Sequence, residues 1–146
     1  MINLDIEGDL PEGITHAQIE SMASTILQKE RPDTRQFLSL KLVNSKEMRE
    51  YNRQYRGVDA DTDILSFQGE DLLLDGVKSS FSNIIIDTNQ VFNQKCLKTY
   101  KEELWQVLIH GLLHICGYDH IKAQDKQKME DLEENYRRLI PGGRLG

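Results

Sequence analysis

Apolar residues alternate with polar ones in two stretches of the first 45 residues, and they repeat with a helical period between those stretches. The alternation at Ile2–Ile6 and Phe37–Val43 predicts two strands, because successive side chains of a strand point to opposite faces. The region between them predicts a helix that starts after Thr15 and runs to about Lys29. Its apolar positions are Ile19, Met22, Ala23, Ile26 and Leu27.

Short apolar runs between turn residues predict further strands in the middle of the chain. They are Thr62–Phe67, a short strand at Leu72–Leu74, and Asn83–Asp87. The run Ile84–Ile86 within the last of these predicts burial on both faces of a sheet. Upstream, Asn44 and Glu47 have capping-box spacing and predict a helix over about Ser45–Tyr55, which Gly57 ends.

The last third of the chain has helical periodicity. It predicts helices at about Thr88–Cys96, Thr99–Cys116 and Ala123–Leu139, followed by a loose tail at 141–146. The inward positions of the second helix are Leu104, Trp105, Leu108, Leu112 and Ile115. The order of elements predicts an α+β fold with a mixed β-sheet and largely segregated helices, in a single domain over residues 1–146.

Composition narrows the class of protein. A net charge of −6 argues against a protein that coats nucleic acid nonspecifically. No run approaches the length of a membrane span, and the first residues lack the features of a signal peptide. Two cysteines, Cys96 and Cys116, are too few for a disulfide framework, and we interpret Cys116 as a small core residue. We therefore expect a cytoplasmic protein with no membrane or DNA partner.

Three of the four histidines fall within eleven residues, spaced as His110-x-x-x-His114-x-x-Gly117-x-x-His120. On a helix, His110 and His114 share one face, with Cβ atoms about 5–6 Å apart. Gly117 can adopt the positive φ that ends a helix, so the chain can return and present His120. Three imidazoles with one open position are typical of catalytic zinc. We predict one Zn²⁺ per chain, with other divalent transition metals as alternatives; the competing interpretation is buried core histidines.

The same spacing occurs in zinc proteases, with one difference. The residue after the first histidine, which is a glutamate general base in those enzymes, is Gly111 here. Glycine cannot transfer a proton, so ordinary peptidase chemistry is disfavoured. We expect Gly111 to permit close packing of its helix instead.

Basic residues recur with helical spacing upstream, at Arg49, Arg53 and Arg56. They would share one helix face and could form a local basic patch that the net charge conceals. Glu47 and Glu50 lie beside them, so a solvated helix face is an equally good interpretation from spacing alone.

Two motifs resemble the YbeY family of bacterial rRNA maturation factors, which are metal-dependent endoribonucleases. The first is His110-Gly-Leu-Leu-His114 with Gly117-Tyr-Asp-His120. The second combines Met48-x-x-Tyr-Asn-x-x-Tyr-Arg56-Gly with Thr62-Asp-Ile-Leu-Ser-Phe67. Both occur in the family's order, and the resemblance extends over nearly the whole chain.

The resemblance implies that His110, His114 and His120 bind zinc, and that Arg56 lines the cleft and is needed for activity. We assign catalytic roles to Arg56 and His114, and substrate binding to Arg56, because a guanidinium can hold a phosphate with two hydrogen bonds. Asp119 is a candidate partner for a histidine ligand. Arg49 and Arg53 gain no support from the resemblance.

The chain departs from the family pattern at two places. Gln68 stands where the family usually has proline, and Ser82-Asn83 replaces its Gly-Asp. Either change could shift a loop or a strand entry at the rim of the cleft, without affecting a predicted metal ligand.

Our leading hypothesis is a zinc-dependent, single-strand endoribonuclease that acts in small-subunit (16S) rRNA maturation and ribosome quality control. Its expected partners are single-stranded rRNA and, through it, the small ribosomal subunit, a ribosomal protein or an assembly GTPase. One alternative is a metallohydrolase of amides or other small molecules. Another is a non-catalytic ribosome-assembly factor with structural zinc, which a fourth protein ligand would indicate.

Overall fold

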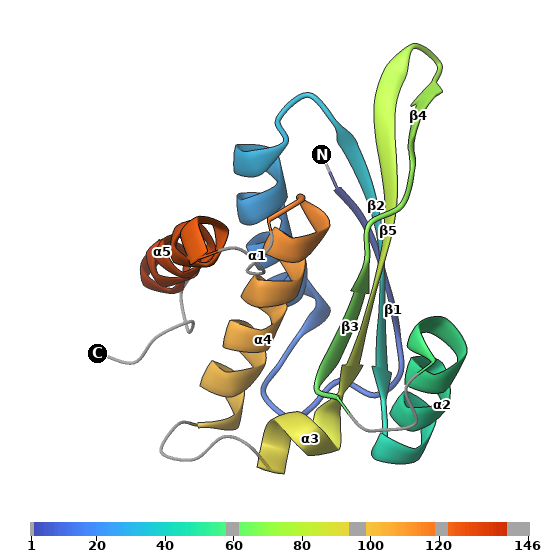
Figure 1. Ribbon diagram of the computed structural model, residues 1–146, viewed down its shortest axis with the longest axis vertical. Helices are drawn as coiled ribbons and strands as arrows, with labels where there is room; N and C mark the ends of the chain where they lie inside the picture. The colour runs from blue at the N-terminus through green and yellow to red at the C-terminus, as the bar shows by residue number, and fades with distance from the viewer. Residues whose placement is uncertain (1, 58–61, 94–98, 119–122, 140–146) are drawn as a thin grey trace.

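The computed structural model describes residues 2–57, 62–93, 99–118 and 123–139 (Figure 1). Its centre is a five-stranded sheet in the order β1-β2-β5-β3, with β4 also paired to β5. The strands are β1 (Ile2–Glu7), β2 (Arg35–Val43), β3 (Ile64–Phe67), β4 (Asp71–Leu74) and β5 (Val77–Asp87). β1, β2 and β5 are parallel, whereas β3 and β4 are antiparallel to β5. The predicted mixed sheet is confirmed.

The described helices lie on both sides of this sheet, with more of them on one side than on the other. They are α1 (His16–Glu30), α2 (Ser45–Arg56), α3 (Thr88–Asn93), α4 (Tyr100–Ile115) and α5 (Ala123–Leu139). Figure 1 shows α1, α4 and α5 on one side of the sheet, which we call the inner face, and α2 on the other side, the outer face. The α+β fold is therefore as predicted, with α2 set apart from the other long helices.

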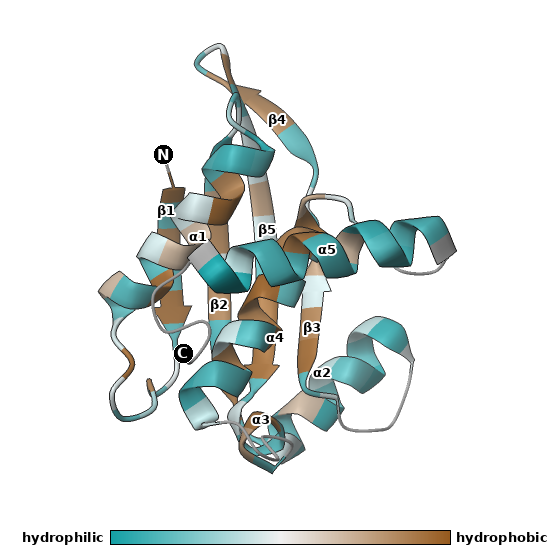
Figure 2. Ribbon diagram, turned by 90° about the vertical axis from the view of Figure 1, so that its left-hand side faces the viewer, coloured by the Kyte–Doolittle hydropathy of each residue, from teal (hydrophilic) through white to brown (hydrophobic). Residues whose placement is uncertain are grey.

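The inner face carries the main core. Alternate β2 residues and two β5 isoleucines point to it and pack against α1 and α4 (Figure 2, brown). These strand residues are Leu38, Leu40, Leu42, Ile84 and Ile86. The predicted apolar stripes of α1 and α4 are buried here, including Trp105, which is 1 % exposed. Ile85 points the other way, into a smaller cluster with Met48 of α2, so the isoleucine run is buried on both faces as predicted.

Local sequence signals set the helix ends. Capping boxes begin α1, α2 and α4, where the N-cap side chain and the side chain three residues later each accept a backbone N–H. The three pairs are Thr15 with Gln18, Asn44 with Glu47, and Thr99 with Glu102. Gly57 ends α2 with φ of 71°. The predicted boundaries of these helices hold within one or two residues.

The predicted strand Asn83–Asp87 is too short, because β5 begins at Val77. The added half is polar, and Ser79, Ser80 and Ser82 are buried in it. Backbone pairing with β2 on one side and β4 on the other holds this segment, so it needs no apolar pattern. The β4–β5 turn, Asp75-Gly76, has positive φ at both residues, the type I′ geometry of a two-residue hairpin.

Some expectations concern residues outside the described ranges. The end of the helix predicted to reach Cys96 and the tail at 141–146 are among them; the described α3 ends at Asn93. Within the described ranges, no helix combines the length and the apolar character that crossing a bilayer requires.

Candidate active site

His110 and His114 lie one turn apart on α4 and line a single pocket of about 450 Å³. The pocket runs along β3, which pairs with β5 on one side only and forms that edge of the ordered sheet path. Arg56, the last residue of α2, lines the same pocket. The structure thus brings together a histidine pair from the inner layer and an arginine from the outer layer, across the edge strand.

Gly111 allows α4 to lie close to β3. A Cβ atom placed on Gly111 would be 2.6 Å from Cδ1 of Ile64 and 3.5 Å from Cδ1 of Ile84. The first distance is far inside van der Waals contact, so any larger residue would push the helix or the isoleucine away. The expected packing role of Gly111 is confirmed. The close approach of α4 to β3 at Gly111 also brings the preceding residue, His110, to the pocket along β3.

The end of α4 has the geometry that its sequence predicts. Gly117 has φ of 102°, and its N–H donates to the carbonyl of His114 at 3.0 Å. The N–H of Tyr118 donates to the carbonyl of Leu113 at 3.2 Å, which completes a Schellman motif. The chain therefore reverses direction immediately after the second histidine.

Glu133 of α5 is a site residue that sequence reasoning missed. Its Oε1 lies 2.8 Å from Nδ1 of His110, and its side chain is 15 % exposed. A carboxylate only accepts hydrogen bonds, so Nδ1 carries the proton in this pair. The hydrogen bond to Glu133 raises the pKa of His110, against the opposing effect of burial. The two residues are 23 positions apart on different helices, and no local spacing signals their contact.

Two tyrosine hydrogen bonds to Glu30 connect α1, the end of α4 and α5 within the inner layer. Glu30, at the end of α1, accepts a hydrogen bond from Tyr118 Oη at 2.6 Å and another from Tyr136 Oη. The bond to Glu30 raises the pKa of Tyr118 to about 12. Burial beside these groups also raises the pKa of the Cys116 thiol to about 12, which fits the interpretation of Cys116 as a core residue rather than a reactive thiol.

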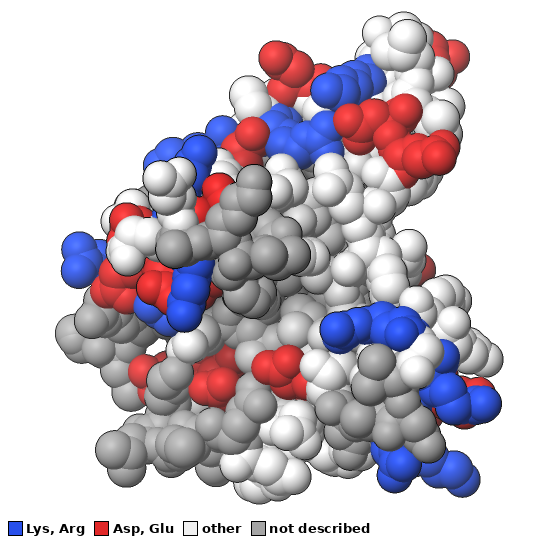
Figure 3. All heavy atoms as spheres, viewed as in Figure 1, with Lys and Arg blue, Asp and Glu red and all other residues white. Residues whose placement is uncertain are grey.

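The three arginines of α2 differ in their surroundings. Arg53 forms an ion pair with Glu50 at 2.5 Å, and neither Arg49 nor Arg53 lines the histidine pocket. Figure 3 shows Lys and Arg side chains gathered over α2. A local basic region is therefore present on an acidic protein, but only Arg56 extends to the histidine pair.

The remaining predicted site residues, His120 and Asp119, lie outside the described residues. Within the described ranges, no group of three His, Cys, Asp or Glu side chains is placed to hold a metal. His110 and His114 line one pocket as the spacing predicts, and metal binding by these two residues and by His120 stays a prediction. The role of Asp119 likewise stays a prediction, and the acceptor found beside His110 is Glu133.

Comparisons with known proteins identify the family of this chain. The family model described as Endoribonuclease YbeY matches residues 5–140. The chain is 38 % identical to Endoribonuclease YbeY of Fusobacterium nucleatum over 113 residues, which cover 74 % of this chain and 69 % of that protein. It is also 38 % identical to Endoribonuclease YbeY of Ruthia magnifica over 98 residues, 66 % of this chain and 67 % of that protein.

A solved structure is similar over nearly the whole fold. The solution structure of TM1509 from Thermotoga maritima matches with a TM-score of 0.64 and 25 % identity, covering 99 % of this chain and 97 % of that one. The resemblance seen in the two sequence motifs is thereby confirmed. The chain belongs to the YbeY family of endoribonucleases.

Proposed function

We propose that this protein is a zinc-dependent endoribonuclease that cleaves single-stranded rRNA during maturation of the small ribosomal subunit (16S rRNA) and in ribosome quality control. The observation that carries the proposal is the placement of Arg56 opposite His110 and His114 across one pocket at the sheet edge. This combines a phosphate-binding cation with two metal-binding imidazoles. Family membership supports RNA as the substrate, and ribosomal RNA would be met in the cytoplasm.

The described residues fit a zinc ion. Two imidazoles one helical turn apart are a usual donor pair, and His120 would be the third ligand just beyond the Schellman turn. Glu133 holds the Nδ1 proton of His110, which leaves Nε2 as the basic nitrogen of that ring. When bound there, zinc supplies a Lewis acid that lowers the pKa of water and neutralises charge that develops on the phosphate.

The protein's own groups supply substrate positioning. The Arg56 guanidinium can donate two parallel hydrogen bonds to a phosphate, and its position at the end of α2 lets it approach from the side opposite α4. The free edge of β3 presents backbone groups along the same pocket. We expect this open edge to accept an extended single strand in preference to a duplex.

The two alternative functions make different predictions for this pocket. Peptidase-type chemistry lacks its base, because position 111 is occupied by a glycine packed against Ile64. A purely structural zinc site would not need Arg56 beside it. Both alternatives are tested directly by the experiment below.

The test is cleavage of a labelled single-stranded 16S rRNA fragment by the purified protein, with and without chelator. We expect cleavage that chelator abolishes, and losses of about 10²-fold or more in His114→Ala and Arg56→Ala. Arg53→Ala is the matched control on the same helix and should retain activity. Duplex RNA, single-stranded DNA and a panel of amide substrates complete the assay.

The proposal fails if His114→Ala cleaves RNA as well as the wild type. Turnover of an amide that exceeds RNA cleavage would favour the small-molecule alternative. Tight zinc and RNA binding without any turnover would favour the non-catalytic assembly factor. Metal analysis of protein purified without added metal identifies the native ion.

A further inference from the structure

We infer that the outer face of the sheet is a second RNA-binding surface, on which Phe37 and Phe81 stack with a base of the strand that leaves the active-site pocket. This inference rests on the proposed function. It extends the substrate's path from the histidine pocket, around the edge strand β3, to the face that α2 leaves uncovered. The chemical class bound is a nucleobase of single-stranded RNA.

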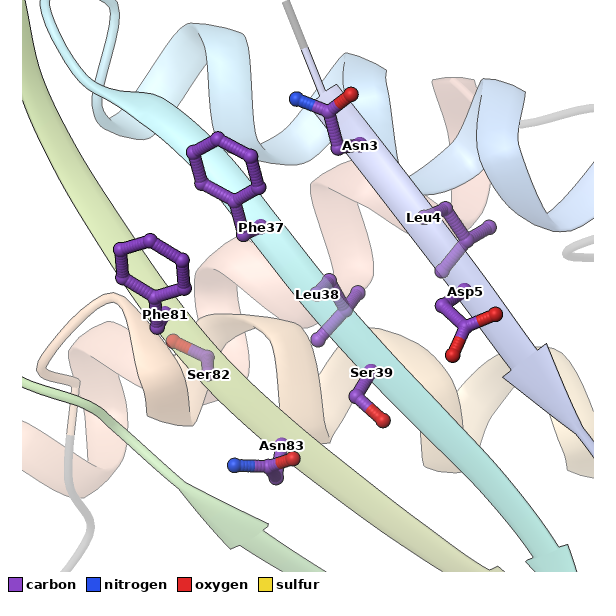
Figure 4. Close-up of a pocket in the computed structure, with 9 residues that line it drawn as sticks. All are labelled: Asn3, Leu4, Asp5, Phe37, Leu38, Ser39, Phe81, Ser82 and Asn83. Carbon is purple, nitrogen blue, oxygen red and sulfur yellow. The ribbon is translucent and has the colours of Figure 1, made fainter. Parts of the chain in front are cut away.

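The two phenylalanines form an exposed aromatic stack. They are direct neighbours across β2 and β5, with ring centroids 4.6 Å apart and an interplanar angle of 8°. Phe81 is 39 % exposed, which is unusual for a large apolar side chain at the centre of a sheet. Figure 4 shows the two rings side by side, on the same side of the sheet as Asn3, Asp5, Ser39 and Asn83. Two parallel rings in a polar surround offer a stacking platform for a base.

On the side of Phe81 away from Phe37, the neighbouring chain has no side chain. The chain beside Phe81 on that side is Gly69, whose own Cβ position would fall 1.5 Å from the Phe81 carbonyl oxygen. No side chain larger than hydrogen can stand there. Gly69 therefore contributes no side chain over the Phe81 ring, which stays 39 % exposed.

Neighbouring hollows that share lining residues lead from the stacked phenylalanines to the histidine pocket. Phe67 lines the histidine pocket and also a hollow of about 290 Å³ with Tyr55. Asn83 lines that second hollow and also the hollow of about 440 Å³ around the stacked phenylalanines. Since Phe67 pairs with Asn83, and Phe81 is two residues further along β5, the step between hollows is about 7 Å. That is the length of roughly one nucleotide of extended RNA.

The chemistry along this path suits RNA better than a protein partner. Tyr55, 61 % exposed, and Phe67 form a second ring pair, with centroids 5.2 Å apart. The cations on the path, Lys41 and Arg56, lie at the second hollow and at the histidine pocket, where a backbone phosphate would pass. Figure 3 shows the notch between the β4–β5 hairpin and α2 lined mainly by uncharged atoms, with basic side chains on its α2 side and acidic ones on its hairpin side. Rings next to cations and amides are the features of single-strand binding surfaces.

The test compares a double variant, Phe37→Leu with Phe81→Leu, with Phe92→Leu as control. Leucine keeps apolar volume but removes the stack, and Phe92 is an exposed phenylalanine of α3 outside the path. Binding of a fluorescent single-stranded 12-mer is measured in chelator, which prevents cleavage. Cleavage of the 12-mer and of a trinucleotide is measured in the metal-loaded enzyme. Thermal unfolding verifies that each variant is folded.

We expect the double variant to bind the 12-mer about tenfold more weakly than the wild type, since one stacked base is lost. Its KM for the 12-mer should rise, with kcat unchanged and trinucleotide cleavage as in the wild type. A 2-aminopurine placed along the 12-mer should be quenched at one position by the wild type and by Phe92→Leu, but not by the double variant.

Two outcomes overturn the inference alone. One is 12-mer binding by the double variant within twofold of the wild type, while the wild type cleaves RNA normally. The other is a change of oligomeric state in the double variant without a change in RNA binding, which would assign this face to a second copy of the chain. If the wild type neither binds nor cleaves RNA, the proposed function fails and the inference fails with it.

Discussion

The two faces of the sheet carry aromatic and apolar residues for different purposes. On the inner face, Ile84 and Trp105 are buried almost completely, in a core that joins α1, α4 and α5. On the outer face, α2 covers one end of the sheet, and Phe81 stands in the open beyond it. The inner layer also holds the histidine pair, whereas the arginine of the site comes from the outer layer. Rigid packing thus positions the histidine pair, whereas the outer face beyond α2 is exposed.

The largest expected difference between the faces is in stability. Ile84→Ala should lower the free energy of unfolding by about 2–5 kcal/mol, because it leaves a cavity in the main core. Phe81→Ala, three residues away on the same strand, should cost about 1 kcal/mol, the value of a surface aromatic stack. Urea unfolding of both variants measures the contrast. Equal losses of unfolding free energy would mean that Phe81 contributes to a hydrophobic core as Ile84 does, and that the two faces do not differ in this respect.

A second prediction separates metal binding from RNA binding. Glu133→Ala removes the acceptor that orients His110, and it should weaken zinc binding about 10–100-fold. Competition with a chromophoric chelator measures this loss. Glu134→Ala is the control on the same helix, because Glu134 pairs with Arg137 and Arg138 instead. Binding of the 12-mer in chelator should be unchanged in both variants; a loss there would link the inner layer directly to RNA.

A third prediction concerns the contact between α4 and the edge strand. Gly111→Ala places a Cβ atom against Ile64 and should cost about 1–2 kcal/mol of stability, with a loss of activity from displaced histidines. Ile64→Val removes the Cδ1 atom that the new methyl group would meet. The double variant should therefore recover both properties. A double-mutant cycle without coupling between the two positions would show that the close approach is not what Gly111 provides.

The smallest effect is expected at the β4–β5 hairpin. Asp71 lies 2.6 Å from Arg31, and the hydrogen bond to Arg31 lowers the pKa of that carboxyl below its ordinary 3.8. A lowered native pKa stabilises the fold above 3.8, and this stabilisation disappears as the pH falls through the native pKa. Asp71 is a third exposed, so the contribution is under about 1 kcal/mol.

Urea unfolding of wild type and Asp71→Asn over a pH series checks this. The wild type should be slightly more stable at pH 7, and the two stabilities should converge towards about pH 2. A constant difference across the series would mean that the Asp71 charge does not contribute. High salt should shrink the difference at neutral pH.

Predictions that rest on local patterns were confirmed in this chain. Thr15 and the capping box at Asn44 mark true helix starts, Gly57 ends its helix, and Gly117 has the positive φ expected of it. These features depend on neighbours within about four residues, so the printed sequence contains all the information they need. The Asp75-Gly76 hairpin was readable in the same way and was overlooked.

Features that depend on distant partners were not readable. The polar first half of β5 is a strand because β2 and β4 supply its hydrogen bonds, and those partners lie far away in the sequence. The His110–Glu133 contact requires α5 to be held against α4, which the hydrogen bonds of Tyr118 and Tyr136 to Glu30 accomplish. The role predicted for Asp119 stays a prediction, whereas the acceptor of His110 is a residue 23 positions away on another helix.

The sequence by itself determined the elements, the spacing of His110 and His114 on one helix face, and the family to which the chain belongs. The family resemblance had already singled out Arg56, and only the tertiary structure decided which carboxylate contacts His110 and which face of the sheet stays open. The physical reason is that periodicity and capping are short-range properties of the backbone. The site and its approaches are made by side chains from four different elements, α2, β3, α4 and α5, that meet only when the core is packed.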